Sequence, residues 1–387
     1  MQRNRILTGR AVFVLLAFLL ALAAVSPAGR AAVVAVLLLP HFFPGDVARP
    51  LRLLTPQPVL EHIEVPGAPG RMVADIYRPG GSGPHPAMVL LLGVNPLPRG
   101  SQQVVRLADG IARAGIVTVV AESEALVAGE IRTEEIDNLV ALFTHLEHDP
   151  GVDPRRIGFS GFCVGAILEL LAASDARIAD RVAFVNAFSV YAETLDVLRA
   201  ILTQSMPTPA GPVRWVPAEL TRTVFLRHTI AALPTPQDRS LLERELLEEN
   251  PLTAVEVEAL TPAGRQVREL LTTRDPQQID DTISTLPADV ISSLEIFSPK
   301  AVIHRLRATT FLMHDQNDTY LPVAGARQLA SALPREAHGS YTEFRLFAHV
   351  VPEGIDDPVL FVREMLKLVR HIQSVVMAAW SGRVASS

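Results

Sequence analysis

Gly161-Phe162-Cys163-Val164-Gly165 decides the fold, and it directly follows the apolar run Arg156-Ile157-Gly158-Phe159-Ser160. Such a run predicts a buried strand, and good helix formers follow at residues 166–173. A nucleophile at a sharp strand-to-helix corner has a strained backbone, and small residues are favoured two positions before and after it. Gly161 and Gly165 meet this need. We therefore predict Cys163 as the nucleophile, with its sulfur above the first amides of a helix that begins near Val164, where the thiolate is favoured.

Two other interpretations of this stretch compete with the prediction. Cysteine is among the most buried residue types, so Cys163 would then be a small core residue in a glycine-containing loop. Ser160 is a second candidate nucleophile, but Gly158-Phe159-Ser160-Gly161-Phe162 lacks the second glycine and places the serine within the strand. The order of strand, nucleophile and helix favours Cys163.

The composition is that of a folded chain with a large core. The chain has 387 residues, 49% hydrophobic residues and a mean hydropathy of +0.27. A net charge of −6 without a run of lysines or arginines argues against nucleic-acid binding. One cysteine excludes an intramolecular disulfide and a cysteine-based zinc site. We expect neither a metal nor an organic cofactor.

The N-terminus predicts a membrane anchor or signal segment at residues 1–45. Arg3, Arg5 and Arg10 precede an uncharged stretch at residues 11–29. About 19 helical residues span roughly 28 Å, enough for a bilayer core. The positive residues would keep that end in the cytoplasm, so the expected location of the rest is extracytoplasmic.

Two alternatives for this segment stay open. The strongest apolar run, residues 11–25, is short and small residues follow it, as in a signal peptide that is cleaved to give a secreted protein. A second apolar run at residues 31–39, within residues 31–44, would be the returning arm of a membrane hairpin. The catalytic part would then be cytoplasmic.

Strands and helices alternate through residues 58–188. Residues 61–65 and 72–77 have the pattern of a hairpin, and residues 87–92 form a continuous apolar run typical of a strand covered on both faces. The alternation predicts an α/β fold with a doubly wound, mostly parallel sheet.

A helical insertion is expected at residues 189–299, where prolines break up helical segments and no convincing strand is found. This length is too great for a loop in a compact domain, so we predict a lid with its own packing. An independent helical domain of unrelated purpose is the alternative. The alternation resumes at residues 300–380, the predicted second part of the core.

These motifs together resemble the α/β-hydrolase superfamily and, within it, the dienelactone hydrolase family. The Cys163 corner carries the resemblance, together with Gly93-Val94-Asn95 after the third strand and a late acid and histidine. The resemblance covers about residues 58–188 and 300–380. It implies the chain order nucleophile, acid, histidine, with Asp318 at the acid position and His349 after the last strand.

Nucleophilic catalysis requires the same three groups: a nucleophile, a base and an acid. A thiol is a weak nucleophile until a base takes its proton, and an imidazole suits that work near neutral pH. A carboxylate must fix the tautomer of that imidazole. His349 is the predicted base and Asp318 its partner, with Asp315 in the same turn as a rival acid.

A developing oxyanion needs two backbone donors. The amide of Val164, at the helix start, is the first. The dienelactone hydrolase pattern places the second at Leu91 and the wider superfamily pattern places it at Val94, and both stay open.

Two departures from the dienelactone hydrolase pattern bear on the substrate. Leu90 stands where that family has a glutamate near the thiol, and Glu353 stands where it has a substrate-binding arginine. The resemblance implies an ester hydrolase acting through an acyl-enzyme, and the missing arginine argues against a negatively charged lactone as substrate. The apolar lid and the expected position near a membrane suggest an uncharged, hydrophobic ester. An acyltransferase and a membrane-tethered, non-catalytic binding protein on the same fold are the alternatives.

Overall fold

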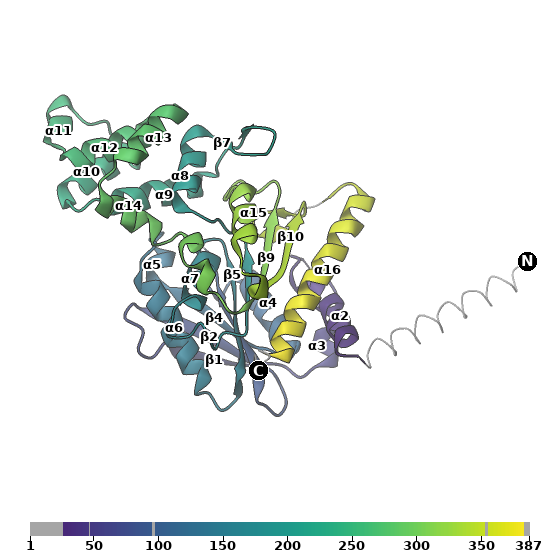
Figure 1. Ribbon diagram of the computed structural model, residues 1–387. Helices are drawn as coiled ribbons and strands as arrows, with labels where there is room; N and C mark the ends of the chain where they lie inside the picture. Colours follow the sequence, from purple (N-terminus) through teal and green to yellow (C-terminus); the bar gives the residue numbers. More distant parts are fainter. Residues whose placement is uncertain (1–25, 46, 95–96, 353–354, 383–387) are drawn as a thin grey trace, which may run out of the picture.

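The computed structural model describes residues 26–45, 47–94, 97–352 and 355–382 and contains an eight-stranded sheet with the strand order β1-β2-β4-β3-β5-β6-β9-β10 (Figure 1). The strands are β1 (Val59–Glu64), β2 (Met72–Arg78), β3 (His85–Leu91), β4 (Val117–Ser123), β5 (Val152–Phe162), β6 (Phe184–Phe188), β9 (Thr309–Asp315) and β10 (His338–Phe344). β2 is antiparallel to both neighbours, and the other pairs are parallel. The predicted N-terminal hairpin and mostly parallel sheet are confirmed.

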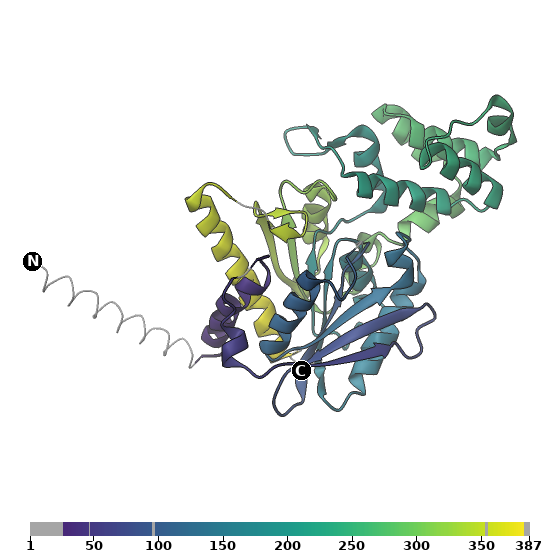
Figure 2. The same ribbon diagram turned by 180° about the vertical axis from the view of Figure 1, so that it is seen from behind.

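Helices cover both faces of the sheet (Figures 1 and 2). On one face α6 (Glu134–Glu147), α7 (Val164–Ala173) and α15 (Val323–Ala332) pack on the central strands. On the other face lie α4 (Gln102–Arg113) and α16 (Pro358–Ser381). Because β3 is apolar along almost its whole length, it can be buried on both sides, as its position in the middle of the sheet requires.

The N-terminal part of the described chain packs on the body through α2 (Pro27–Leu38). Ala31, Ala35 and Leu38 are buried in the cluster that α2 shares with α16. The apolar run weighed as a returning membrane arm is thus a short helix against the core. Among the described residues, the structure has no helix with the length and apolar character needed to cross a bilayer. Of the anchor or signal segment predicted at residues 1–45, residues 1–25 lie outside the described residues.

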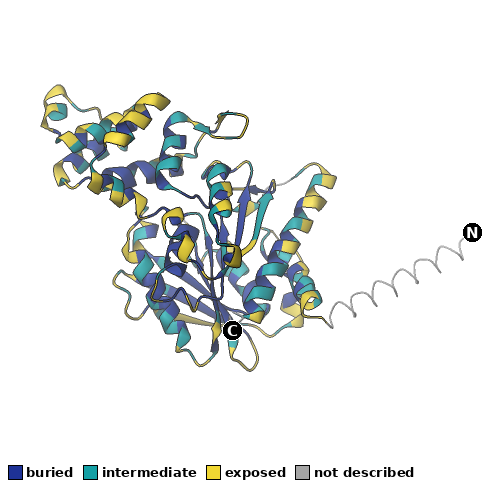
Figure 3. Ribbon diagram, viewed as in Figure 1, coloured by how far each residue is buried: buried dark blue, intermediate teal, exposed yellow. Residues whose placement is uncertain are grey.

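The insertion is mainly helical and projects from the carboxyl end of the sheet (Figure 1). Its elements are α8 (Thr194–Thr203), β7 (Ser205–Met206), β8 (Val213–Arg214), α9 (Glu219–Ala231), α10 (Pro236–Leu246), α11 (Ala254–Ala259), α12 (Pro262–Thr272), α13 (Pro276–Thr285) and α14 (Ala288–Glu295). Leucines and isoleucines of these helices form an apolar core separate from that of the sheet, and the exposed residues lie on the outside of the insertion (Figure 3). The β7–β8 ribbon corrects the expectation that the insertion has no strand, since its two-residue strands are too short to give a sequence pattern.

The remaining elements are short. They are η1 (Leu39–His41), α3 (Leu51–Leu54), α5 (Glu124–Val127), η2 (Pro299–Ala301), η3 (Ile303–Arg305), η4 (Arg335–Ala337), β11 (Phe347–Ala348) and β12 (Val351–Pro352). β11 and β12 form a small antiparallel ribbon that follows β10.

Candidate active site

Cys163 stands at the corner between β5 and α7, as predicted. Its backbone has φ 55° and ψ −132°, a conformation that non-glycine residues rarely adopt. The Cys163 amide donates a hydrogen bond of 2.8 Å to the Phe188 carbonyl at the end of β6. A strained residue that the surrounding backbone holds in place is typical of a functional site.

The two glycines around Cys163 are required by close backbone contacts. A Cβ on Gly161 would lie 2.6 Å from the backbone nitrogen of Ala166, and one on Gly165 would lie 2.5 Å from the Leu91 carbonyl oxygen. Both distances are shorter than any real carbon contact. The crowding that predicted the corner from sequence is therefore present.

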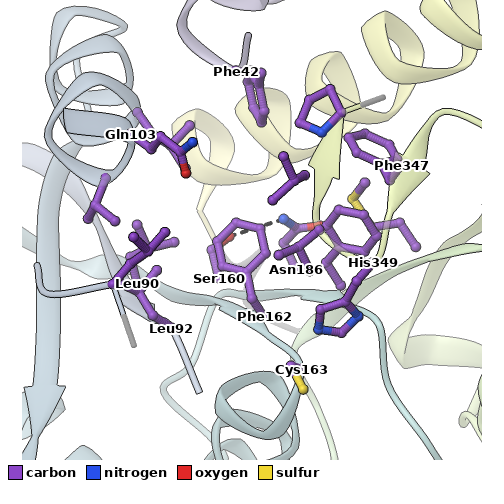
Figure 4. A pocket seen from close by; sticks show the side chains of 18 of the residues that line it. Phe42, Leu90, Leu92, Gln103, Ser160, Phe162, Cys163, Asn186, Phe347 and His349 are labelled. Atoms are coloured by element: carbon purple, nitrogen blue, oxygen red, sulfur yellow. Dashed lines mark hydrogen bonds between the residues drawn. The ribbon is translucent and has the colours of Figure 1, made fainter. Parts of the chain in front are cut away.

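His349 lies between β11 and β12 and reaches the site from a distant part of the chain (Figure 4). Its Nδ1 is 2.9 Å from Oδ2 of Asp318, and its ring stacks on Tyr320 with the centroids 4.3 Å apart. Its backbone is also left-handed, with φ 57°. These contacts fix the ring and leave Nε2 for the Cys163 side chain, whose charge interacts with the imidazole.

Asp318 is buried and its carboxylate is held by several donors. Oδ1 accepts hydrogen bonds from the amides of Tyr320 (2.7 Å) and Leu321 (3.1 Å), and Oδ2 accepts one from the Ser189 hydroxyl at 2.6 Å. Burial alone would raise the pKa of Asp318, but the hydrogen bond and charge of His349, with help from Ser189, lower it to about 2. Asp318 is therefore ionised and faces His349.

The same neighbours set the protonation of His349. Burial would lower the pKa of this imidazole, whereas the charge of the Cys163 thiolate and the hydrogen bonds with Asp318 and Cys163 raise it to about 10. At neutral pH the raised pKa favours the imidazolium form of the ring, which faces the ionised Asp318.

Asp315, the rival acid, has a different task. Its Oδ2 accepts hydrogen bonds from the amides of Leu346 (2.8 Å) and Phe347 (2.9 Å), and its Oδ1 accepts one from Asn317 at 2.9 Å. Asp315 thus ties β9 to the loop that carries His349 and does not face the imidazole itself.

Three residues around Asp318 were missed by the sequence reasoning. The Ser189 hydroxyl lies 3.1 Å from His349 Nδ1, and His314 Nε2 lies 3.5 Å from Asp318 Oδ2. Trp215, from the insertion, donates a hydrogen bond of 2.7 Å to the Asp318 carbonyl. His314 directly precedes Asp315 in β9, and Ser189 directly follows β6. Trp215 has no sequence signal, because its contact depends on how the insertion folds back.

A cavity of about 420 Å³ opens beside Cys163 and His349 and runs between the sheet and helices α16, α4 and α2 (Figure 4). Its lining is mostly apolar and includes Phe42, Phe162 and Phe347. Its volume lies in the range typical of small-molecule sites, about 300–1000 Å³. The insertion contributes to the lining through α9, with Leu220, Thr221, Val224 and Phe225.

The oxyanion candidates lie at different places around Cys163. Val164 and Val94 line the cavity together with Cys163. Leu91 does not line it. A Cβ on Gly93, which has φ 64°, would lie 3.2 Å from the Val164 nitrogen, so the loop before Val94 passes close to the first amide of α7.

The remaining sequence candidates are placed as follows. Ser160, the rival nucleophile, lies within β5 and lines the cavity away from the corner. Leu90 is fully buried and lines the same cavity, so an apolar side chain fills the position of the family's glutamate. Glu353 lies outside the described residues. In the described ranges, no group of three or more histidine, cysteine, aspartate or glutamate side chains is arranged to hold a metal ion.

Comparisons with known proteins give likeness only to solved structures. No family model matches the chain, and no curated protein matches it. Est1E from Butyrivibrio proteoclasticus has 12% identity and a TM-score of 0.45, with 81% of this chain and 98% of Est1E covered. The dienelactone hydrolase from Anabaena variabilis has 12% identity and a TM-score of 0.42, with 81% of this chain and 97% of that one covered.

A hyperthermophilic esterase from the archaeon Pyrobaculum calidifontis has 18% identity and a TM-score of 0.46, with 91% of this chain and 88% of that one covered. We draw nothing about activity from similarities at this level. The strand order and the strained corner after β5 are observed in this structure and do not depend on those similarities. On these two features, the chain has the α/β-hydrolase fold that the resemblance predicted.

Proposed function

We propose that this protein hydrolyses an uncharged carboxylic ester through a covalent acyl-enzyme on Cys163. His349 acts as acid and base, and Asp318 orients it. The observation that carries the proposal is the contact chain from Cys163 through His349 to Asp318, at the mouth of an apolar cavity. An apolar cavity with a few convergent polar groups is typical of a site for a small organic substrate.

The raised pKa of His349 supports a thiolate and imidazolium pair as the resting state. The thiolate attacks the ester carbonyl carbon, the carbon–sulfur bond forms, and the carbonyl electrons move to oxygen. Because a thiolate leaves more readily than an alkoxide, the tetrahedral intermediate goes forward only if the leaving oxygen receives a proton. His349 Nε2 supplies that proton as the carbon–oxygen bond breaks and the alcohol departs.

The second half returns the enzyme to its first state. Neutral His349 takes a proton from water, the hydroxide adds to the thioester carbonyl, and the carbon–sulfur bond breaks to release the acid and the thiolate. Asp318 stabilises the imidazolium in both halves. For the oxyanion we place the donors at the amides of Val164 and Val94, since these residues border the cavity beside Cys163.

The membrane anchor also stays a proposal. It rests on the arginines and the apolar run at residues 1–29 of the sequence.

The test of the proposed function is the turnover of p-nitrophenyl octanoate by the wild type, by Cys163→Ala and by Thr310→Val. Thr310 is buried in β9 and bonds to the Ala308 carbonyl, outside the cavity, so its variant is the matched control. We expect the alanine variant to lose turnover, and acid quenching of the wild type to give a thioester at Cys163 in the mass spectrum. Full turnover by the alanine variant would overturn the proposal. Product analysis with added alcohols separates hydrolysis from acyl transfer.

A further inference from the structure

Three polar side chains line the apolar cavity away from the catalytic corner. Ser160 of β5, Asn186 of β6 and His371 of α16 all border it, and their elements come from distant parts of the chain. Figure 4 shows the hydrogen bond between Ser160 and Asn186 among the hydrophobic side chains. Polar groups in such surroundings are costly unless they are hydrogen-bonded, so each has to be accounted for.

The three residues and Thr342 of β10 form one hydrogen-bond chain. The distances are 3.3 Å from Thr342 Oγ1 to His371 Nδ1, 2.8 Å from His371 Nε2 to Asn186 Oδ1, and 3.1 Å from Asn186 Nδ2 to Ser160 Oγ. Burial lowers the pKa of His371 to about 4, so the ring is neutral and carries one N–H.

These contacts give the chain a direction. Asn186 Oδ1 can only accept, so His371 donates to it from Nε2 and accepts from the Thr342 hydroxyl at Nδ1. Asn186 then donates through Nδ2 to Ser160 Oγ. The hydroxyl proton of Ser160 is left over, and within the described residues it has no acceptor among the side chains and carbonyls. A chain of aligned donors strengthens its last member, which here is an O–H at the wall of the cavity.

We propose that the Ser160 hydroxyl is a subsite that binds an oxygen atom on the acyl chain of the substrate, so that the preferred substrate is an ester of an oxygenated acid, with a keto or ether oxygen along an otherwise apolar chain. This inference rests on the proposed ester hydrolysis and names its substrate class. Ser160 precedes Cys163 by three residues of an extended strand, or about 10 Å. The oxygen therefore lies deep in the chain and not beside the reacting carbonyl.

The alternation along β5 supports this placement. Ser160 and Phe162 both line the cavity, whereas Gly161 between them faces the other side, where its hydrogen lies against Glu169. Leu90 of β3 is the register partner of Ser160 in the sheet, and Met88 and Met313 also line the cavity; these three side chains carry no hydroxyl or amide.

The experiment is a positional scan with p-nitrophenyl esters of one straight-chain fatty acid and of its keto isomers, with the carbonyl at successive carbons. For the wild type we expect kcat/KM to be highest for one isomer deep in the chain, by roughly fivefold over the unsubstituted ester, the gain of one neutral hydrogen bond. Ser160→Ala should lose this preference and still cleave the unsubstituted ester. Thr310→Val, the control outside the cavity, should keep it.

The outcomes separate the two proposals. If no ester is cleaved by the wild type, the proposed function fails. If the unsubstituted ester is cleaved but no isomer is preferred, or if the preference survives in Ser160→Ala, the subsite is overturned while the function stands. Should Ser160→Ala not fold, the wild-type scan decides, joined by inhibition with a keto fatty acid compared with its unsubstituted acid. Equal inhibition by the two acids would count against the subsite.

Discussion

His349 and His371 border the same cavity, and both are buried, with 9% and 3% of their surface exposed. Their pKa values nevertheless move in opposite directions, to about 10 for His349 and to about 4 for His371. Burial pulls both values down. At His349 the charges of Cys163 and Asp318 reverse that effect, whereas the hydrogen-bond partners of His371, Thr342 and Asn186, are neutral.

The comparison shows how one cavity can hold two kinds of polar chemistry. At the corner, charged groups support proton transfer. Away from the corner, the neutral hydrogen-bond chain of His371, Asn186 and Ser160 can contribute to substrate binding but not to proton transfer. A histidine's role therefore follows from the charges it faces and not from its burial.

The largest effect is expected from His349→Gln. The variant removes the acid and base while keeping a polar side chain, so turnover of an alkyl ester should fall by roughly 10²–10⁴. The measurement is steady-state kcat/KM, with His338→Gln, an exposed histidine, as the control. If His371→Gln lost as much activity on an unsubstituted ester as His349→Gln does, the division of roles would be wrong.

The second-largest effect is expected in the pH dependence of the unfolding free energy, to which His371 and His349 contribute in different pH ranges. Folded His371 has a pKa below the ordinary 6.5, so the unfolded chain binds more protons between pH 6.5 and about 4, and stability falls as the pH is lowered through that range. The loss from this residue is about 3 kcal/mol. Denaturant unfolding of His371→Phe should show a smaller loss than the wild type. His228, whose pKa burial also lowers to about 4, is present in both the wild type and His371→Phe, so its contribution cancels in the comparison.

His349 should affect the unfolding free energy at alkaline pH. Its folded pKa lies above 6.5, so its contribution is complete below pH 6.5 and is lost as the pH rises through about 10. The difference in unfolding free energy between the wild type and His349→Gln should therefore shrink from pH 7 to pH 10. A difference that grows over this range would contradict the assigned ion pair.

Removing the thiolate should bring the pKa values of His349 and His371 closer together. The charge of Cys163 is the strongest influence that raises the pKa of His349, so Cys163→Ser should shift that pKa down toward 6.5. NMR titration of the imidazole carbon-bound protons measures both rings in one sample. The pKa of His371 should stay where it is, because that ring does not face Cys163. A His349 pKa that stays near 10 in the variant would show that Asp318 alone sets it.

The smallest effect is expected at Tyr320. Its ring stacks on His349 at 4.3 Å and 18°, and such stacking is worth about 1 kcal/mol beyond burial. Tyr320→Leu should therefore lower kcat/KM by about fivefold, and Tyr320→Phe, which keeps the ring, should stay near the wild type. If the phenylalanine variant loses as much as the leucine variant, the hydroxyl and not the stacking is what counts.

Much of the core could be predicted because its signals are local. The glycines around Cys163 are required by contacts at the corner. The apolar run of β3 can be found from the residues of that strand alone. The acid and histidine could be placed because they follow particular strands. The structure brings Asp318 and His349 together and gives Asp315 a structural task, which spacing alone did not distinguish.

The rest depended on contacts that no local pattern carries. The sequence pattern marks Ser160 only as a rival nucleophile and does not mark His371 as a site residue. Their shared hydrogen-bond chain forms because α16 crosses the sheet beside β5 and β6. The insertion was predicted as helical, but which of its residues reach the site, such as Trp215, depends on its packing.

The docking of α2 on α16 has a practical consequence. Leu38 and Phe42 form part of the cavity wall, and His41 bonds to the Arg106 carbonyl of α4 at 3.0 Å. A shortened chain that starts at β1, the obvious choice for recombinant expression, would open that wall to solvent while leaving every catalytic residue in place. Such a product would mislead a screen, since it would accept bulky esters that the intact chain excludes.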